Sequence, residues 1–242
     1  MINSESPSHH TVIVTGASGG IGRATVHAFA AAGYPVLATG RNEEILRSLK
    51  SETGCDYIRG DIRDENFVRS LFEHAGKKGR IDALVNNAAV SYIGVLQDMT
   101  AEAWDDVINT NLRSVFLTCR EVIPLFLRQG CGSVVNVSSV WGNVGASCEV
   151  AYSASKGGVN AFTKALAREL APSHIRVNAA AFGTIDTQMN AFLSPEDRSA
   201  LEDEIGMGRF GTPEEAADLI LDLAVHHPYL TGQIVTMDGA WT

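Results

Sequence analysis

The feature that most constrains the fold is a regular alternation between short apolar runs and longer segments with helical spacing of hydrophobic residues. The apolar runs lie at residues 11–15, 36–39, 57–58, 83–85, 134–137, 175–181 and 234–237. The helically spaced segments lie at residues 21–32, 43–51, 66–75, 104–127, 153–170 and 213–225. This alternation predicts βαβ units with right-handed crossovers, in a parallel sheet covered on both faces. Because no linker rich in proline, glycine or serine divides the chain, we expect an α/β fold with one doubly wound sheet of about seven strands.

Composition and charge disfavour several classes of protein. The 242 residues include 19 Lys and Arg against 28 Asp and Glu, a formal net charge of −9, and 45% are hydrophobic. An acidic chain without a basic cluster is poorly suited to bind nucleic acid or an anionic membrane surface. No apolar stretch approaches the roughly 20 residues that a transmembrane helix needs.

The first residues and the cysteines bear on location. Residues 1–10 are polar, without the apolar region of a signal peptide, so we expect a flexible lead-in followed by one domain over residues 11–242. The cysteines lack C-x-x-C spacing and histidines at ligand spacing, so we expect reduced thiols, no metal site and a cytoplasmic protein. These cysteines are Cys55, Cys119, Cys131 and Cys148.

A glycine-rich turn follows the first predicted strand. Gly16, Gly20 and Gly22 lie between that strand and a helix-forming segment. Glycine lets the chain turn tightly and bring backbone N–H groups at a helix N-terminus close to a pyrophosphate. The spacing differs from G-x-G-x-x-G, but its strand–turn–helix context indicates a dinucleotide site.

The ends of the next three predicted strands would complete this site. Arg41 stands where an acidic residue would bind the adenosine ribose, and its guanidinium suits a 2′-phosphate. We therefore favour NADP(H), with NAD(H) as the alternative. Asp61, with the Ile62 backbone beside it, would accept from the adenine amino group or simply cap a helix. The amides of Asn86 and Asn87 should brace neighbouring strands or touch the cofactor, because asparagine is unfavourable at a strand end unless its amide is used.

A second group of residues suggests catalysis. Tyr152 and Lys156 are four residues apart at the start of a predicted helix, and therefore on one face. Since an ammonium favours the phenolate, we expect Lys156 to lower the pKa of Tyr152 from its ordinary value near 10. Such a tyrosine can protonate a carbonyl oxygen while a nicotinamide delivers hydride. Ser139 ends the preceding strand and Asn111 lies within a predicted apolar helix; each alone would suit a structural role.

In this order the motifs resemble those of the short-chain dehydrogenase/reductase family, from about Thr11 to Trp241. The resemblance implies a Rossmann-type fold. It rests on the glycine turn from Thr15, the run Asn86-Asn87-Ala88-Ala89, and Asn111, Ser139, Tyr152 and Lys156.

The resemblance also implies a role for each matched residue. Tyr152 would be the general acid in reduction and the base in oxidation, and Lys156 would lower its pKa and hold the nicotinamide ribose. Ser139 would hydrogen-bond the substrate carbonyl, and Asn111 would hold a water that relays protons from Lys156. The implied cofactor-binding residues are Gly16, Ser18, Gly20, Ile21, Gly22, Arg41, Asp61, Ile62, Asn87, Ala88, Tyr152, Lys156, Ile185 and Thr187.

Three residues depart from the family's pattern. Ala89 replaces a glycine, and Phe182 replaces a proline and so removes a fixed φ. Glu149 is an unusual acid three residues before Tyr152. It would face the substrate together with Ser139 and Tyr152, or remain a solvated loop residue.

Within the family, the chain looks most like the bacterial 3-oxoacyl-[acyl-carrier-protein] reductases, which use NADPH to reduce a carrier-bound β-keto thioester in fatty acid biosynthesis. Residues 138–142 and 148–150 also resemble enzymes that reduce an aminopentanone group on a lysine of elongation factor P, where Glu149 could pair with the amine. Another small ketone or a hydroxysteroid is a further alternative. A catalytically idle NADP(H) sensor or scaffold is the alternative of another class.

The apolar surface of residues 104–127 and 153–170 predicts a homo-oligomer, a tetramer as in the family.

Overall fold

The computed structural model describes residues 10–242. Residues 1–9 of the expected lead-in lie outside the described residues, whereas His10 already belongs to the first strand. Seven parallel strands form one sheet in the order β3-β2-β1-β4-β5-β6-β7. The strands are β1 (His10–Thr15), β2 (Val36–Gly40), β3 (Asp56–Arg59), β4 (Arg80–Asn86), β5 (Gly132–Ser139), β6 (Ile175–Phe182) and β7 (Ile234–Met237). The predicted α/β class and the doubly wound, Rossmann-type sheet are confirmed.

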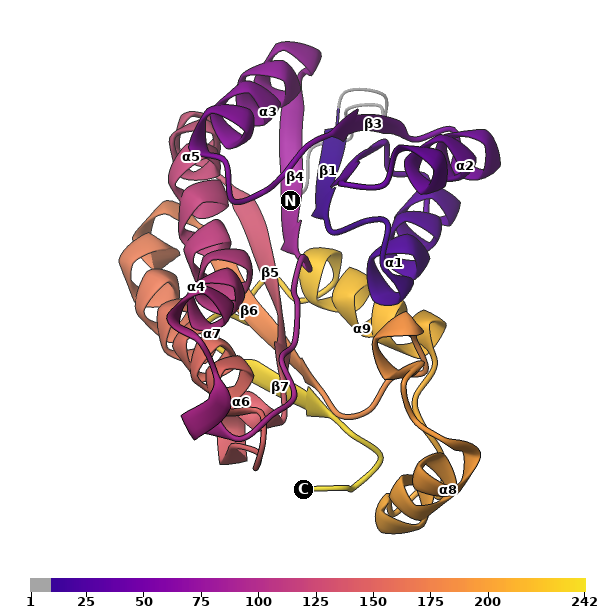
Figure 1. Cartoon of the computed structure of the whole chain (residues 1–242). Helices are drawn as coiled ribbons and strands as arrows, with labels where there is room; N and C mark the ends of the chain where they lie inside the picture. Colours follow the sequence, from indigo (N-terminus) through magenta and orange to yellow (C-terminus); the bar gives the residue numbers. More distant parts are fainter. Residues whose placement is uncertain (1–9) are drawn as a thin grey trace.

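Helices cover both faces of the sheet (Figure 1). One layer holds α1 and α9, and the other holds α3, α5 and α7. The helices are α1 (Gly20–Ala31), α2 (Glu43–Thr53), α3 (Glu65–Lys78), α4 (Ala101–Ile108), α5 (Ser114–Gln129), α6 (Trp141–Val144), α7 (Val150–Leu170), α8 (Pro195–Glu204) and α9 (Pro213–Val225). Short 3₁₀ turns lie at Leu96–Asp98, Ala171–Ser173 and Gln188–Asn190. Within residues 10–242, no helix combines the length and apolar character needed to cross a membrane.

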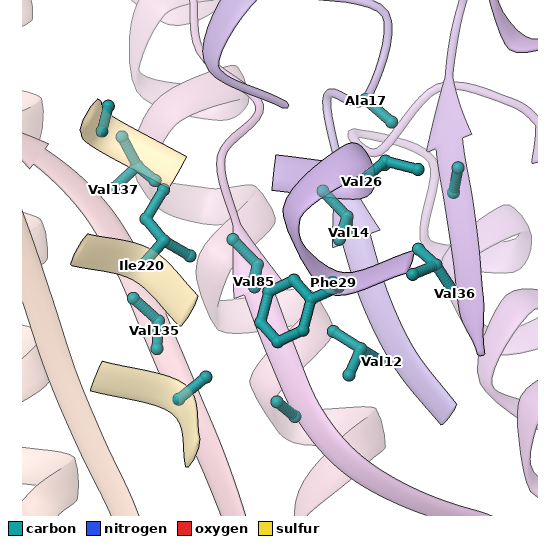
Figure 2. Packing of buried hydrophobic residues seen from close by; sticks show 14 of the residues in the cluster. Val12, Val14, Ala17, Val26, Phe29, Val36, Val85, Val135, Val137 and Ile220 are labelled. Carbon is teal, nitrogen blue, oxygen red and sulfur yellow. The ribbon is translucent and has the colours of Figure 1, made fainter. Parts of the chain in front are cut away.

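Alternate residues of the strands supply two hydrophobic cores, one on each face. In β1, Val12 and Val14 belong to one core and Ile13 to the other. Phe29 of α1 packs over Val12 and Val85, as Figure 2 shows. Because strands covered on both faces bury successive side chains in turn, their sequences are continuously apolar. The short apolar runs of the sequence are explained by this double burial.

The prediction of one continuous helix over residues 104–127 is wrong, because the helix is interrupted. Helix α4 ends at Ile108, a π-helical turn covers Asn109–Arg113, and α5 begins at Ser114. A π-turn inserts an extra residue and often marks a functional position. Here it contains Asn111, whose side chain bonds to a backbone outside the helix, as described below.

A buried polar network joins the middle of the sheet to the helices. Asn86 of β4 donates to Asn136 of β5 across 2.9 Å, and the Thr118 hydroxyl of α5 donates to Asn86 Oδ1 at 2.8 Å. Asn136 in turn donates to Thr163 of α7 at 2.8 Å. Every member is buried, so each amide and hydroxyl depends on the others for its hydrogen bonds. Asn86 therefore braces neighbouring strands.

We expect Asn136→Ala to lower the free energy of unfolding by about 2–4 kcal/mol, since it leaves Asn86 and Thr163 buried without these partners. Ser133→Ala is the matched control, because the Ser133 hydroxyl in the same strand is buried and has no hydrogen-bond partner among the described residues. Its loss should cost less than about 0.5 kcal/mol. Urea unfolding of both variants, at equal m values, measures the difference. Equal losses in the two variants would show that the network contributes nothing specific.

Candidate active site

The carboxyl ends of the parallel strands open into a cleft of about 680 Å³. Ligands of doubly wound sheets bind at this edge, where the strand order reverses. Among the predicted site residues, only Gly22 and Asn111 do not line the cleft. Those that line it are Gly16, Ser18, Gly20, Ile21, Arg41, Asp61, Ile62, Asn87, Ala88, Ser139, Glu149, Tyr152, Lys156, Ile185 and Thr187.

The glycine turn is tightly held at one end of the cleft. Gly16 adopts φ +63°, and a Cβ there would lie 2.7 Å from the Ala88 Cα. A Cβ on Gly22 would clash with the carbonyl oxygen of Gly16, which is why Gly22 matters although it does not line the cleft. Asn87 Nδ2 donates to the carbonyl oxygens of Thr15 and Gly16, at 3.1 and 3.0 Å. The turn therefore requires glycine and is fixed by the loop after β4.

The start of α1 suits a pyrophosphate. Its N-cap is Gly19, which offers no side-chain cap, and no acidic residue lies in the first turn. The helix N-terminus therefore presents free N–H groups and the positive end of its dipole to the cleft. Thr187 closes the turn from the other side, since a Cβ on Gly20 would lie 2.6 Å from its Cγ2. These features fit a dinucleotide.

The end of the cleft where the adenosine is predicted to bind, called the adenosine end below, holds three charged residues. Both oxygens of Asp61 accept from the Arg63 guanidinium, at distances of 2.6–3.0 Å, and Oδ1 also accepts from the Arg63 backbone N–H. Arg63 thereby holds the pKa of Asp61 below its ordinary value, and it also pairs with Asp106. By accepting from the Arg63 backbone N–H, the Asp61 side chain stabilises the turn after β3. This contact agrees with the alternative in which Asp61 has a local structural role. Arg41 is exposed, and no ion pair of its side chain occurs among residues 10–242.

The catalytic candidates meet at the opposite end of the cleft. Tyr152 and Lys156 lie in the first turns of α7, and Ser139 is the last residue of β5. Lys156 is buried, its Nζ donates to the carbonyl oxygen of Val137 at 2.8 Å, and it lies 5.6 Å from the centre of the Tyr152 ring. The neighbouring Ser138 instead donates to Asn160 of α7 at 2.6 Å. A phenol, an ammonium and a hydroxyl from two elements therefore share one cleft with the glycine turn.

The expected lowering of the Tyr152 pKa by Lys156 is wrong for this structure. Burial and the charge of Glu149 raise the pKa of Tyr152 to about 12, against a smaller lowering by the Ser139 hydroxyl. Burial lowers the pKa of Lys156 to about 8. The ammonium lies over the ring and is bonded to Val137, so desolvation dominates both values. Tyr152 is consequently protonated at neutral pH.

The side chain of Asn111 braces a loop. Its Oδ1 accepts from the Val90 N–H at 2.8 Å, and its Nδ2 donates to the Val90 carbonyl oxygen at 2.8 Å and to the Ser155 hydroxyl at 3.0 Å. Both amide hydrogens are thus used, which leaves one oxygen lone pair for a water. The observed contacts make Asn111 a positioning residue that ties the loop after β4 to α7.

Glu149 faces the cleft just before α7. The Ser91 hydroxyl donates to its Oε2 at 2.7 Å, and the Gly94 N–H donates to the carbonyl oxygen of Cys148 at 2.8 Å. These bonds join the loop after β4 to the loop before α7. Asp61 is the other carboxylate lining the cleft, and it belongs to the adenosine end. Within residues 10–242, the catalytic end therefore carries one carboxylate, that of Glu149, and its charge raises the pKa of Tyr152.

Sequence reasoning missed several residues that line the cleft. Thr39 is buried at the end of β2, and its hydroxyl has no partner within the described part of the chain. Ser91 and Trp241 also line the cleft and lie outside the motifs that predicted the site. Two signals in the sequence could have indicated such residues: Thr39 is a threonine at the end of a strand, and Trp241 is a tryptophan close to Gly239. No group of three His, Cys, Asp or Glu side chains in residues 10–242 could hold a metal ion.

Comparisons with known proteins agree with this geometry. Residues 10–198 match the family model described as short chain dehydrogenase. The chain is 42% identical over 234 residues to the 3-oxoacyl-[acyl-carrier-protein] reductase FabG of Thermotoga maritima, covering 94% of this chain and 95% of that protein. It is 36% identical over 235 residues to the protein of the same name from Aquifex aeolicus, covering 94% and 95%.

A solved structure of a ketoreductase has a closely similar fold. A variant of actinorhodin polyketide ketoreductase, crystallised with NADPH, superimposes with a TM-score of 0.93 at 31% identity, over 98% of each chain. The chain therefore belongs to the short-chain dehydrogenase family and is an oxidoreductase.

Proposed function

We propose that the chain is an NADPH-dependent ketone reductase whose substrate is a 3-oxoacyl thioester carried on acyl carrier protein. The observation that carries this proposal is that Ser139, Tyr152 and Lys156 line one cleft with the glycine turn. Relatives named 3-oxoacyl-[acyl-carrier-protein] reductase, at 36–42% identity over nearly the whole chain, support the substrate. The reaction would belong to fatty acid biosynthesis in the cytoplasm.

The homotetramer stays a prediction, supported by the exposed Phe116 and Leu127 of α5.

The residues of the cleft suit carbonyl reduction. A bound nicotinamide would supply hydride to the carbonyl carbon. The Tyr152 hydroxyl would donate its proton to the carbonyl oxygen, and a pKa of about 12 keeps that proton in place at neutral pH. Ser139 would donate a hydrogen bond to the same oxygen and fix its position. Lys156, whose Nζ lies 5.6 Å from the centre of the Tyr152 ring, would hold the nicotinamide ribose beside the phenol.

The adenosine end supports NADP(H). Arg41 is exposed at the cleft, while the carboxylate of Asp61 is neutralised by Arg63. The guanidinium of Arg41 is therefore available for a 2′-phosphate, and no acid at the end of β2 would repel one.

We expect Tyr152→Phe to reduce the rate of thioester-dependent NADPH oxidation by about 10³-fold, since it removes the proton donor. The dissociation constant of NADPH should change by less than about threefold, because the ring is retained. Tyr57→Phe is the control, since the Tyr57 hydroxyl bonds to Glu43 outside the cleft. A Tyr152→Phe protein with a tenth of the parent's rate would argue against Tyr152 as the acid. If the parent protein binds NADPH but reduces no ketone, the result would favour the alternative that the protein is a catalytically idle NADP(H) sensor or scaffold.

We expect Arg41→Ala to raise KM for NADPH about tenfold or more, through loss of a charge-assisted hydrogen bond to the 2′-phosphate, and to leave KM for NADH unchanged. Arg47→Ala, in the exposed pair with Glu43 on α2, is the matched control. Initial rates with each coenzyme give the comparison. A parent protein that uses both coenzymes equally well would disprove the NADP(H) preference.

Glu149 favours a second candidate function, the reduction of an amino-ketone such as an aminopentanone group on a lysine of elongation factor P. Its Oε2 bonds to Ser91, which leaves Oε1 able to pair with a substrate ammonium. Glu149→Gln should then lower kcat/KM for an amino-ketone about tenfold, and change it less than about twofold for an uncharged ketone of equal length. Ser91→Ala keeps the charge and serves as the control. Equal effects on both ketones would exclude this candidate.

A further inference from the structure

The segment that follows β7 returns to the catalytic end of the cleft. In Figure 1 it runs on from the carboxyl end of β7, past the edge of the sheet. Its Trp241 lines the cleft together with Trp141 of α6. The two rings lie 4.7 Å apart between centres at 60°, an edge-to-face contact. Two large aromatic side chains, distant in sequence, therefore form one wall.

Hydrogen bonds hold Trp241 in this position. The Asp238 carboxylate accepts from the N–H groups of Ala240 and Thr242 and from the Thr242 hydroxyl, each at 3.0 Å. Ala240 adopts φ +63°, a conformation that a residue with a Cβ rarely takes unless its surroundings impose it. The Met207 N–H also donates to the Gly239 carbonyl oxygen at 2.9 Å. Hydrogen bonds on both sides of Trp241 therefore fix the backbone of this segment.

Trp141 is equally fixed, and it lies beside the catalytic hydroxyl. Its backbone N–H donates to Ser139 Oγ at 3.2 Å. Asn143, two residues further in α6, donates to Thr236 of β7 at 3.3 Å. The aromatic wall therefore begins where the Ser139 hydroxyl would bind a carbonyl oxygen.

Further apolar side chains line the cleft beside these polar groups. Ile93, Met189 and Phe192 line it and are 54%, 45% and 63% exposed. Exposed apolar side chains that gather in a cleft mark a binding surface. An apolar group beyond the carbonyl carbon would be buried between these residues and the tryptophans.

Building on the proposed ketone reduction, we propose that Trp241, packed on Trp141, determines specificity by binding the alkyl chain of the ketone substrate. The indole supplies a rigid apolar surface with little conformational entropy to lose. Burial of one methylene corresponds to about a fourfold gain in affinity. The preferred substrates are therefore ketones with a medium or long apolar chain, rather than short ones.

The test compares chain lengths in the complete protein with NADPH. Two substrate series are used, 3-oxoacyl N-acetylcysteamine thioesters and 2-alkanones, each with short and long chains. In the parent protein kcat/KM should rise with chain length. In Trp241→Ala it should fall about tenfold for the long substrates and less than about twofold for the short ones. Trp241→Phe should retain most of the dependence, and Trp104→Phe, in α4 outside the cleft, should not change it.

A spectroscopic readout shows whether the pair exists as described. Coupling between the two indoles in the far-ultraviolet circular dichroism should disappear in both Trp141→Phe and Trp241→Phe, and persist in Trp104→Phe. An unchanged chain-length dependence in Trp241→Ala, or an equal loss for short substrates, would overturn the role of Trp241 while leaving ketone reduction intact. If the protein reduces alkanones but no thioester, the proposed thioester substrate is overturned. The chain-length dependence of alkanone reduction in Trp241→Ala then decides the role of Trp241. Turnover of neither series would overturn both proposals.

Discussion

The parallel sheet is the constraint on which the rest of the structure depends. Because all seven strands run in one direction, their carboxyl ends lie at a single edge. Segments far apart in the sequence, such as the turn at Gly16, the end of β5 at Ser139 and the start of α7 at Tyr152, therefore reach one cleft. The double burial that makes the strands apolar also makes this arrangement rigid. Every functional role proposed above uses that shared edge.

Buried and half-buried amides connect the rigid sheet to the loops around the cleft. Asn86 and Asn136 join adjacent strands, Asn87 holds the glycine turn, and Asn111 holds Val90. Each amide is costly to bury alone and is stable only when its partners are in place. The π-turn at Asn111 fits the same principle, since an irregular helix accompanies two hydrogen bonds to a loop beside the site.

The electrostatics of the catalytic end suit a proton donor. Burial raises the pKa of Tyr152 and lowers that of Lys156, so both groups are shifted toward their neutral forms. Glu149 adds to the shift of Tyr152, and a cation bound at Glu149 would reduce that contribution. For the amino-ketone candidate, the charge of the substrate and the acidity of Tyr152 would therefore be coupled through Glu149.

The sequence by itself determined the order of strands and helices, the glycine turn, and the placement of Tyr152 and Lys156 on one helix. These features depend on local spacing, because a continuous apolar run marks a strand buried on both faces and a period of 3.6 residues marks a helix. Only the tertiary structure decided that the helix breaks at Asn111, that Asp61 binds Arg63, that the pKa of Tyr152 rises and that Trp241 meets Trp141. Each of these depends on a partner brought close by packing, or on burial. No local pattern encodes such a partner, because the energies of desolvation and contact arise only when distant segments meet.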